Sequence, residues 1–203
     1  MNGWSRRLAG ALVAAAAGAA VPASAQPAAP RAAVWVASGA FVPADDVFSE
    51  AYGLPQWPLI VQGDVRVAGP VWLFAGARRL ARDGETVAAA PGAPDASFPL
   101  ELRTTSVRFG GSLAGQVGRV QVAGGVGAEY SSGEERWPTE GLAFDIAAWG
   151  VLVQGSVRLP VWRHLACLGL IEYSFLPADP DDVLLERVDL GGITLGGGVL
   201  LTF

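Results

Sequence analysis

The sequence contains no lysine, one histidine and one cysteine. Because Cys167 has no second cysteine to pair with, an intramolecular disulfide is excluded. A fold without disulfides must take its stability from other sources, such as a full hydrophobic core. Charged residues make up only 16% of the chain, against ~25% in ordinary globular proteins. The formal net charge of −5 argues against a nucleic-acid partner.

Long apolar runs are also missing, with one exception near the N-terminus. Residues 8–21 are apolar, Arg6 and Arg7 precede them, and Ala23-Ser24-Ala25 follows. This pattern is typical of a secretory signal peptide. A membrane anchor is the alternative, but the run is alanine-rich and shorter than the ~20 residues that a span needs. We therefore expect cleavage of residues 1–25, a short periplasmic leader over 26–30, and a barrel over 31–203.

The rest of the chain alternates between strand-like runs and connectors. The runs cover residues 31–42, 58–68, 70–80, 100–115, 118–131, 143–159, 162–175 and 188–203, and none shows a helical apolar stripe. Every proline after the leader lies in a connector or begins a run, as a hydrogen-bonded sheet requires. Connectors are long at 43–57, 81–99, 132–142 and 176–187, and short elsewhere.

This alternation of connector lengths places both termini and all tight turns at one end of a sheet, as in bacterial outer-membrane barrels. We predict an all-β fold, a transmembrane up-and-down antiparallel β-barrel of eight strands. Ten strands are the alternative, should residues 81–99 form a hairpin. The last run, 188–203, is then expected to pair with the first, because an open edge cannot persist in lipid.

Most runs alternate between an apolar and a polar face. The polar face carries mid-strand charges of both signs, which can satisfy one another inside a narrow lumen. The expected lumenal network consists of Gln62, Asp64, Arg66, Arg108, Gln121, Glu129, Gln154, Arg158 and Glu172. The run 70–80 stays ambiguous, because both of its faces are equally apolar. Glycines on the polar face could leave a wider cavity, and a soluble barrel would turn the apolar face inward.

Charge and aromatic residues divide the two ends of the predicted barrel. Most acids fall in the long connectors, and we interpret them as a solvated rim that could also bind divalent cations between lipopolysaccharide phosphates. Tryptophan gathers near predicted strand ends, where membrane interfaces lie. The expected interfacial aromatics are Trp57, Trp72, Trp137 and Trp162, whereas Trp35 and Trp149 lie deeper in their runs.

With its signal peptide, alternating loop lengths and final strand ending Leu200-Leu201-Thr202-Phe203, the chain resembles the small eight-stranded outer-membrane β-barrel family of the OmpA/OmpX type. The resemblance covers residues 31–203. It implies a location in the bacterial outer membrane, a salt-bridged lumen that conducts poorly, and lipids and lipopolysaccharide as partners of a monomeric barrel. It also implies that Leu201 and Phe203 form the signal read by the barrel-assembly machinery.

No residue set with catalytic spacing is recognisable. The single histidine, His164, lies beside a tight turn at the predicted periplasmic end, away from any Ser–acid pair at the loop end. Cys167 is predicted to face lipid, without a second ligand nearby. We expect no enzyme activity, no cofactor and no metal. The favoured role is structural or surface-interacting, through envelope integrity, adhesion or loop-mediated binding. The alternatives are a narrow porin-like channel and a soluble lipocalin-like barrel with an apolar ligand.

Overall fold

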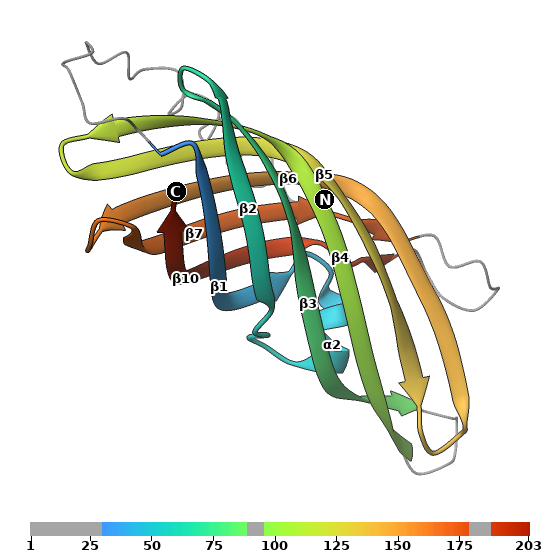
Figure 1. Cartoon of the computed structure of the whole chain (residues 1–203). Helices are drawn as coiled ribbons and strands as arrows, with labels where there is room; N and C mark the ends of the chain where they lie inside the picture. The colour runs from blue at the N-terminus through green and yellow to red at the C-terminus, as the bar shows by residue number, and fades with distance from the viewer. Residues whose placement is uncertain (1–29, 89–95, 179–187) are drawn as a thin grey trace, which may run out of the picture.

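The computed structural model describes residues 30–88, 96–178 and 188–203, so the predicted signal peptide lies outside the described residues. Eight strands close into one antiparallel barrel in the order β1-β10-β7-β6-β5-β4-β3-β2 (Figure 1). The strands are β1 (Ala32–Pro43), β2 (Leu59–Ala68), β3 (Val71–Ala88), β4 (Ala96–Val117), β5 (Val120–Trp137), β6 (Leu142–Pro160), β7 (Leu165–Phe175) and β10 (Gly192–Thr202). The prediction of an eight-stranded up-and-down barrel is confirmed, and so is closure between the first and last strands.

Short connections join β2 to β3, β4 to β5 and β6 to β7 at one end of the barrel, which we call the turn end. The first two turns use Gly69 and Gly118, whose φ angles of 49° and 61° lie in the left-handed region that glycine adopts without strain. Strand β1 begins at this same end, and Phe203 lies there beside it. The opposite end, which carries the longer connections, is called the loop end.

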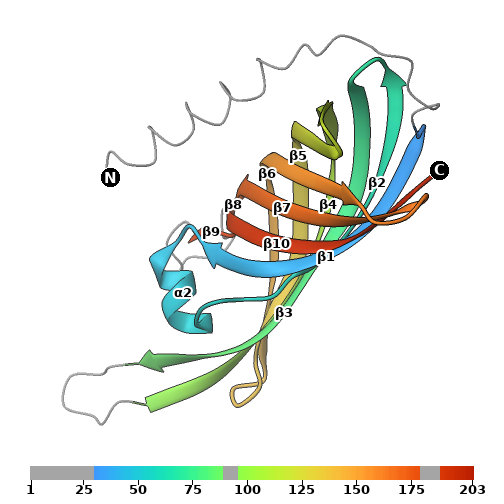
Figure 2. The same ribbon diagram turned by 90° about the vertical axis from the view of Figure 1, so that its left-hand side faces the viewer.

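The barrel wall has two very different heights. Strands β3 to β6 contain 18, 22, 18 and 19 residues, whereas β1, β2, β7 and β10 contain 12, 10, 11 and 11. Strands β3 to β6 therefore extend far beyond the others at the loop end, and we call this extension the wall (Figure 2). The predicted connectors are wrong as loops over residues 81–88, 96–99 and 132–137, because β3 pairs with β4 out to Ala88 and Ala96 and β5 pairs with β6 out to Trp137 and Leu142. The ten-strand alternative is also wrong, because the described parts of both segments lengthen existing strands of an eight-stranded barrel.

The first long connector contains a helix, α2 (Asp46–Tyr52), which the sequence analysis missed. Its seven residues place Phe48, Ala51 and Tyr52 on one face, and Gly53 ends it with a φ of 68°. A short strand pair, β8 (Pro177–Ala178) and β9 (Val188–Asp189), lies in the last connector. The described residues include no helix long and apolar enough to cross a membrane.

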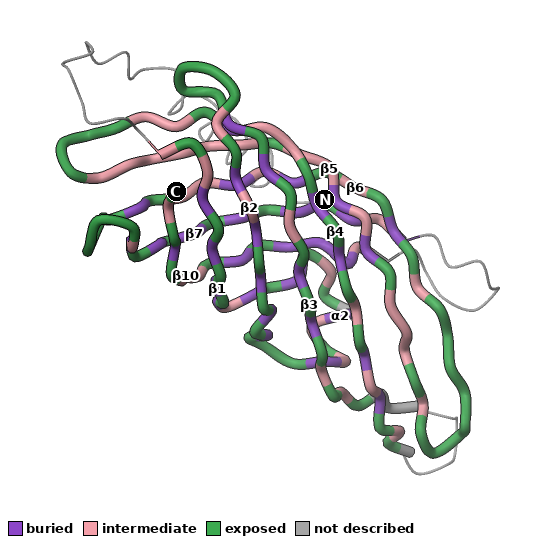
Figure 3. The backbone as a smooth tube through the Cα atoms, in the orientation of Figure 1, coloured by how far each residue is buried: buried purple, intermediate pink, exposed green. Residues whose placement is uncertain are grey.

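Buried and more exposed residues alternate along most of the strands, clearly on β1 and β7 and less regularly on β5 (Figure 3). Several inward positions are glycines, which we expected to widen the lumen, but neighbouring atoms already fill their space. A Cβ atom on Gly110 or Gly127 would lie 2.6 or 2.9 Å from the ring of Phe74. The same Cβ atoms would lie closer still to the neighbouring strand, against the carbonyl oxygen of Val126 or that of Phe109. The ring and the adjacent backbone therefore fill both positions and leave no cavity there.

Candidate functional site

Three buried ion pairs lie inside the barrel. Their nitrogen–oxygen distances are 3.2, 2.8 and 2.7 Å, and the pairs are Arg78–Glu129, Arg108–Glu172 and Arg158–Asp64. All six side chains are at most 8% exposed. The interior thus holds equal numbers of positive and negative groups, which is the condition under which charges tolerate burial.

Two of these arginines span the full width of the barrel. Arg158 on β6 reaches Asp64 on β2, which is four strand positions away in either direction around the barrel. Arg78 on β3 likewise donates a hydrogen bond of 3.3 Å to Ser174 on β7, the strand opposite. Contacts of this kind cross the lumen and block it.

Each lumenal arginine also lies over an aromatic ring. The guanidinium carbon is 5.2, 5.6 and 6.0 Å from the ring centroid in the pairs Arg78–Phe41, Arg108–Trp35 and Arg158–Trp72. A cation over an aromatic face is attracted by the ring quadrupole, more strongly where water is excluded. The interior is therefore built as three units, each made of one arginine, one acid and one aromatic side chain.

Asp64 joins two of these units. Its carboxylate accepts hydrogen bonds from Trp35 Nε1 at 3.1 Å, Gln62 Nε2 at 2.9 Å and Arg158 Nη2 at 2.7 Å. Because Trp35 also lies against Arg108, the indole links the Asp64–Arg158 pair to the Arg108–Glu172 pair. These contacts form one connected network across strands β1, β2, β4, β6 and β7.

Little space remains around the network. A cavity of about 10 Å³ lies among Trp35, Gln62, Gln154, Arg158 and Leu170, which is close to the volume that a single water molecule occupies. Apolar residues pack beside it, and this cluster comprises Ala33, Trp35, Ala37, Ile60, Ala166, Leu168, Leu170 and Leu200. The described lumen is thus filled by side chains, as expected for a barrel of eight strands.

The structure brings together seven of the nine residues expected in the lumenal network. The buried residues are Gln62, Asp64, Arg108, Glu129, Gln154, Arg158 and Glu172. Arg66 instead lies at the turn end, where its Nε donates to the carbonyl of Gly69 at 2.6 Å. Gln121 is partly buried and pairs across the sheet with Arg158. Arg78 and Ser174 were not predicted as members of the network. Arg78 was missed because both faces of β3 contain apolar residues, so the sequence did not show which face points inward.

The predicted aromatic positions divide in the same way. Trp57 and Trp162 are 64% and 79% exposed. Trp137 is partly buried, and its ring lies 6.4 Å from Phe98 and 6.3 Å from Phe144. Trp72 is wrong as an interfacial residue, because it is buried beneath Arg158 inside the barrel. A tryptophan near the end of a strand still points inward when it occupies one of the alternate positions whose side chains face the lumen.

The outer surface of the barrel carries the apolar face of the strands. Large hydrophobic side chains that are at least 41% exposed include Val36, Val61, Leu73, Val107, Phe109, Leu113, Val126, Val157, Ile171, Tyr173, Leu195 and Val199. A water-soluble barrel would bury this face and expose the charged one. The apolar-out, charged-in arrangement contradicts the soluble lipocalin-like alternative and is the arrangement of transmembrane barrels.

Along the wall the outward residues change from apolar to charged, and on β4 the inward residues change the opposite way. On β4 the outward residues Val107 and Phe109 give way to the charged Arg103 and Glu101. Inward on the same strand, buried Arg108 gives way to buried Leu102 and Leu100. The alternation itself is uninterrupted. The apolar belt therefore ends near Tyr130 and Trp149, whose rings stack on the outer surface at 4.8 Å.

Helix α2 closes the loop end by packing against the inner face of the wall. The resulting cluster, which we call the cap, contains Phe48, Tyr52, Leu100, Leu102, Ala148, Leu176, Ala178 and Leu190, with Ala51, Trp137 and Ile146 beside it. These residues come from α2, the wall and the last connector. Full burial of one such large side chain contributes roughly 1.5–3 kcal/mol, so the cap is a small hydrophobic core in its own right.

Polar contacts fix α2 in this position. The Tyr52 hydroxyl donates to Glu135 Oε2 at 2.6 Å, and Trp137 Nε1 donates to Glu135 Oε1 at 2.9 Å. Arg82 Nε donates to the backbone carbonyl of Tyr52 at 3.0 Å. Burial, followed by the hydrogen bond and charge of Glu135, raises the pKa of Tyr52 well above its ordinary range. The hydroxyl is therefore held in its neutral, donating form.

The outer face of the wall carries paired charges. Arg103 lies 3.4 Å from Glu101, and Arg136 lies 2.8 Å from Glu134. Opposite charges also face each other across the strands, since Glu101 pairs with Arg136 and Arg103 with Glu134. The hydrogen bond from Arg136, and then the charges of Arg136 and Arg103, lower the pKa of Glu134. This face is suited to water and to charged partners.

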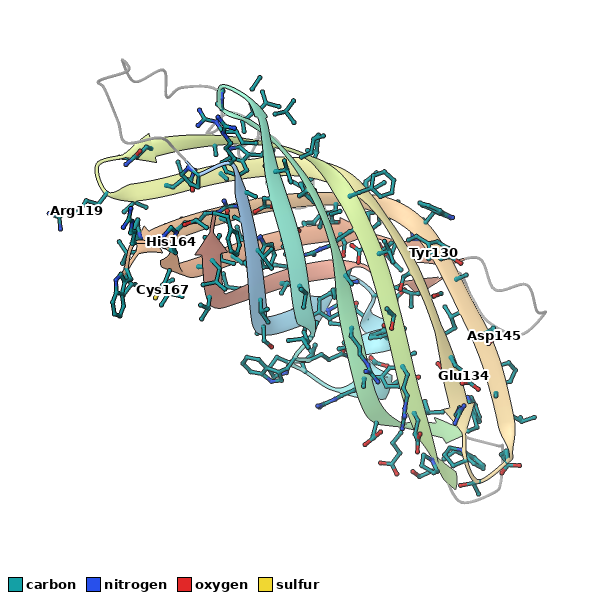
Figure 4. All side chains as sticks on the ribbon, in the orientation of Figure 1. Arg119, Tyr130, Glu134, Asp145, His164 and Cys167 are labelled. Carbon is teal, nitrogen blue, oxygen red and sulfur yellow. The ribbon has the colours of Figure 1, made fainter. Side chains whose placement is uncertain are left out.

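Other candidate groups are placed as follows. His164 lies at the turn end, exposed, with Nδ1–H donating to the carbonyl of Thr202 at 3.0 Å (Figure 4). Cys167 is exposed on the outward face. Within residues 30–88, 96–178 and 188–203, no cluster of three or more His, Cys, Asp or Glu side chains could hold a metal. The expectation that the chain is not an enzyme stays a prediction.

Solved structures share this architecture. The chain is similar to Neisserial surface protein A, with a TM-score of 0.61 and 11% identity over 85% of this chain and 96% of that chain. It is similar to the outer membrane protein OprG from Pseudomonas aeruginosa, with a TM-score of 0.65 and 12% identity over 86% and 96%. A major outer membrane protein from Thermus thermophilus gives a TM-score of 0.51 and 13% identity over 86% and 100%. No protein-family model matches the sequence, and no curated protein matches it. The fold is that of the small eight-stranded outer-membrane barrels.

Proposed function

We propose that this chain is an integral protein of the bacterial outer membrane that does not conduct and acts at its loop end, by supporting the envelope or by binding a partner at the cell surface. The observation that carries the proposal is the change of the outward residues of β3 to β6 from apolar to mostly charged or small, which on β4 is a reversal of both faces. On the turn-end side of this change the outer surface suits lipid, and on the loop-end side it suits water. The wall then stands outside the membrane with a charged outer face.

A narrow channel is the competing function. It requires a continuous aqueous path, yet Arg158–Asp64 and Arg78–Ser174 cross the lumen and the cap covers its loop end. Moving charged solutes past this network would require breaking buried ion pairs, which costs about 3–5 kcal/mol for each pair that loses a partner. The filled interior therefore favours a structural or surface-interacting role.

The partners follow from the same surfaces. We propose membrane lipids around the apolar belt, lipopolysaccharide beside the wall, and a monomeric barrel inserted by the assembly machinery through the final strand. The described part of the loop end carries more acids than arginines, including Asp46, Glu50, Glu85, Glu140 and Asp145. A partner with positive charge, or divalent cations bridging to lipopolysaccharide phosphates, would complement this surface.

Three measurements test the proposed function together. In cells the protein should fractionate with the outer membrane, and the purified protein should show a folded band that migrates differently before and after boiling. Planar-bilayer recordings should show no conductance steps. Regular single-channel steps would reject the non-conducting role in favour of the channel, whereas recovery in the soluble periplasm would reject the membrane location itself.

A further inference from the structure

The turn end of the barrel carries a continuous group of basic side chains. The basic arc, as we call it, consists of Arg31, Arg66 and Arg163, with His164 beside them. Arg31, Arg163 and His164 are exposed and Arg66 is partly exposed. The described residues supply no acid to the outer surface of this end. Asp64 is the nearest described carboxylate along β2, but it is buried in the lumen and paired with Arg158.

Backbone hydrogen bonds hold the arc together across four neighbouring strands. The N–H of Arg66 donates to the carbonyl of Arg31 at 2.8 Å, and the N–H of Arg31 donates to the carbonyl of Phe203 at 2.9 Å. The N–H of Thr202 donates to the carbonyl of His164 at 2.9 Å, which brings the β6–β7 turn to the same edge. The arc therefore follows the ends of β2, β1, β10 and β7, which are adjacent in the barrel.

Exposed apolar side chains surround the arc. Val161, Trp162 and Phe203 are 62%, 79% and 68% exposed, and the apolar belt begins directly beyond them. Aromatic side chains next to arginines at the edge of an apolar belt lie at the depth of lipid headgroups. A guanidinium there can bind a phosphate through two parallel hydrogen bonds.

The two ends of the barrel differ in charge. Figure 4 places Arg119 and His164 at the turn end and Glu134 and Asp145 at the loop end. At the loop end, Arg103 and Arg136 on the outer face of the wall have acidic partners, and Arg79 lies exposed on β3. No acid among the described residues is paired with an arginine of the arc. A carboxylate on Phe203 would offset one of its three arginines and leave the arc positive.

We propose that the basic arc binds the phosphate groups of anionic phospholipids in the membrane leaflet that surrounds the turn end. This inference rests on the proposed membrane location and adds a lipid preference to it. Each arginine near a membrane surface contributes about fivefold to the affinity for anionic lipid. The preference weakens with salt, because these charges are exposed.

The test uses the full barrel reconstituted in vesicles of equal phosphatidylcholine and phosphatidylglycerol. After gentle detergent extraction, native mass spectrometry measures which lipid stays bound. The wild-type protein should retain phosphatidylglycerol in clear excess, and added salt should reduce that excess. The variant R31Q/R66Q/R163Q should lose the excess by tenfold or more. The variant R79Q/R103Q/R136Q removes the same charge at the loop end and should keep it.

The outcomes separate the two proposals. Equal retention of both lipids by the wild-type protein, or an unchanged excess in R31Q/R66Q/R163Q, would overturn the lipid preference alone. An equal loss in both triple variants would also overturn it, because net charge and not the arc would then control binding. Failure of the wild-type barrel to insert into either vesicle would overturn the membrane location. Gel mobility before boiling checks that each variant is folded, and the wild-type salt dependence tests the arc without any substitution.

Discussion

Replacing Arg108 with methionine tests whether the lumenal network holds the barrel together. The side chains of Arg108 and Glu172 are 0% and 2% exposed, and Arg108 Nη1 lies 2.8 Å from Glu172 Oε1. The substitution leaves the Glu172 carboxylate buried without its ionic partner, which costs about 3–5 kcal/mol. That loss lowers the equilibrium constant for folding by about two to four powers of ten. Equilibrium urea unfolding of the reconstituted protein, followed by the gel mobility of unboiled samples, measures it.

Two further variants control this experiment. R108M/E172M removes both charges, leaves no unpaired ion and should recover most of the lost stability. R136M breaks the exposed pair with Glu134 and should shift the unfolding curve far less, because exposed ion pairs contribute little. The reasoning fails if R108M unfolds like R136M, or if the double variant is no more stable than R108M.

Three other predictions concern the cap, the lumen and the final strand. The neutral form of Tyr52 is favoured in the folded state, so the contribution of its hydroxyl to holding α2 should be complete below about pH 10 and decline above it. Limited proteolysis across this range should show that residues 43–57 become more susceptible to cleavage in the wild-type protein, whereas cleavage of Tyr52→Phe should not depend on pH. Identical cleavage profiles for the two proteins would contradict the role of the hydroxyl. Gly110→Val should clash with the backbone of β5 at Val126 and with the Phe74 ring, and should destabilise the barrel by about 1–3 kcal/mol, as overpacking does. A lower urea midpoint would show this, whereas an unchanged midpoint would show that the strand and the ring can both shift to make room. Phe203→Asp should lower the amount of folded protein in the outer membrane, and normal levels would rule out the last residue as part of an assembly signal.

The strand pattern was readable from the sequence because a closed barrel imposes a strict period of two. Val61, Val65, Gln62 and Asp64 already show which face is polar, and the structure places them accordingly. Most prolines marked connectors or strand ends, because proline lacks the N–H that a ladder bond needs. Pro99 is the exception, since it lies inside β4 opposite Glu85. Strand number and closure therefore followed from local chemistry alone.

The sequence analysis did not detect that the surroundings of a single strand change along its length. Around Leu102 the inward side changes from polar to apolar, so an apolar or charged residue no longer has the same meaning above and below that point. Residues 81–99 and 132–142 were predicted as connectors because they lie between the apolar, glycine-rich runs, and the acids within them were interpreted as a solvated rim. The longer hairpins could have been recognised only from inward positions that change from polar to apolar while the alternation continues, as between Arg108 and Leu102.

Helix α2 and Arg78 were missed for related reasons. A helix of seven residues has too few turns for its apolar stripe to exceed chance. Arg78 stands on a strand whose faces both contain aromatic or aliphatic residues, so its direction depends on which ring fills the lumen. Packing between distant strands decides this, and period-two alternation carries no information about it.

The cap has a consequence for how the surface of this protein can change over time. Loops on bacterial barrels usually accept substitutions freely, because nothing packs against them. Here the inward residues of the wall, such as Leu100 and Leu102, are tied to α2, while outward neighbours such as Arg103 and Thr105 face solvent. Under selection to escape recognition, variation along these strands should therefore appear at every second position. Substitutions that weaken the binding of an antibody or phage to the wall would therefore be confined to the outward residues, because the inward residues are constrained by packing against α2.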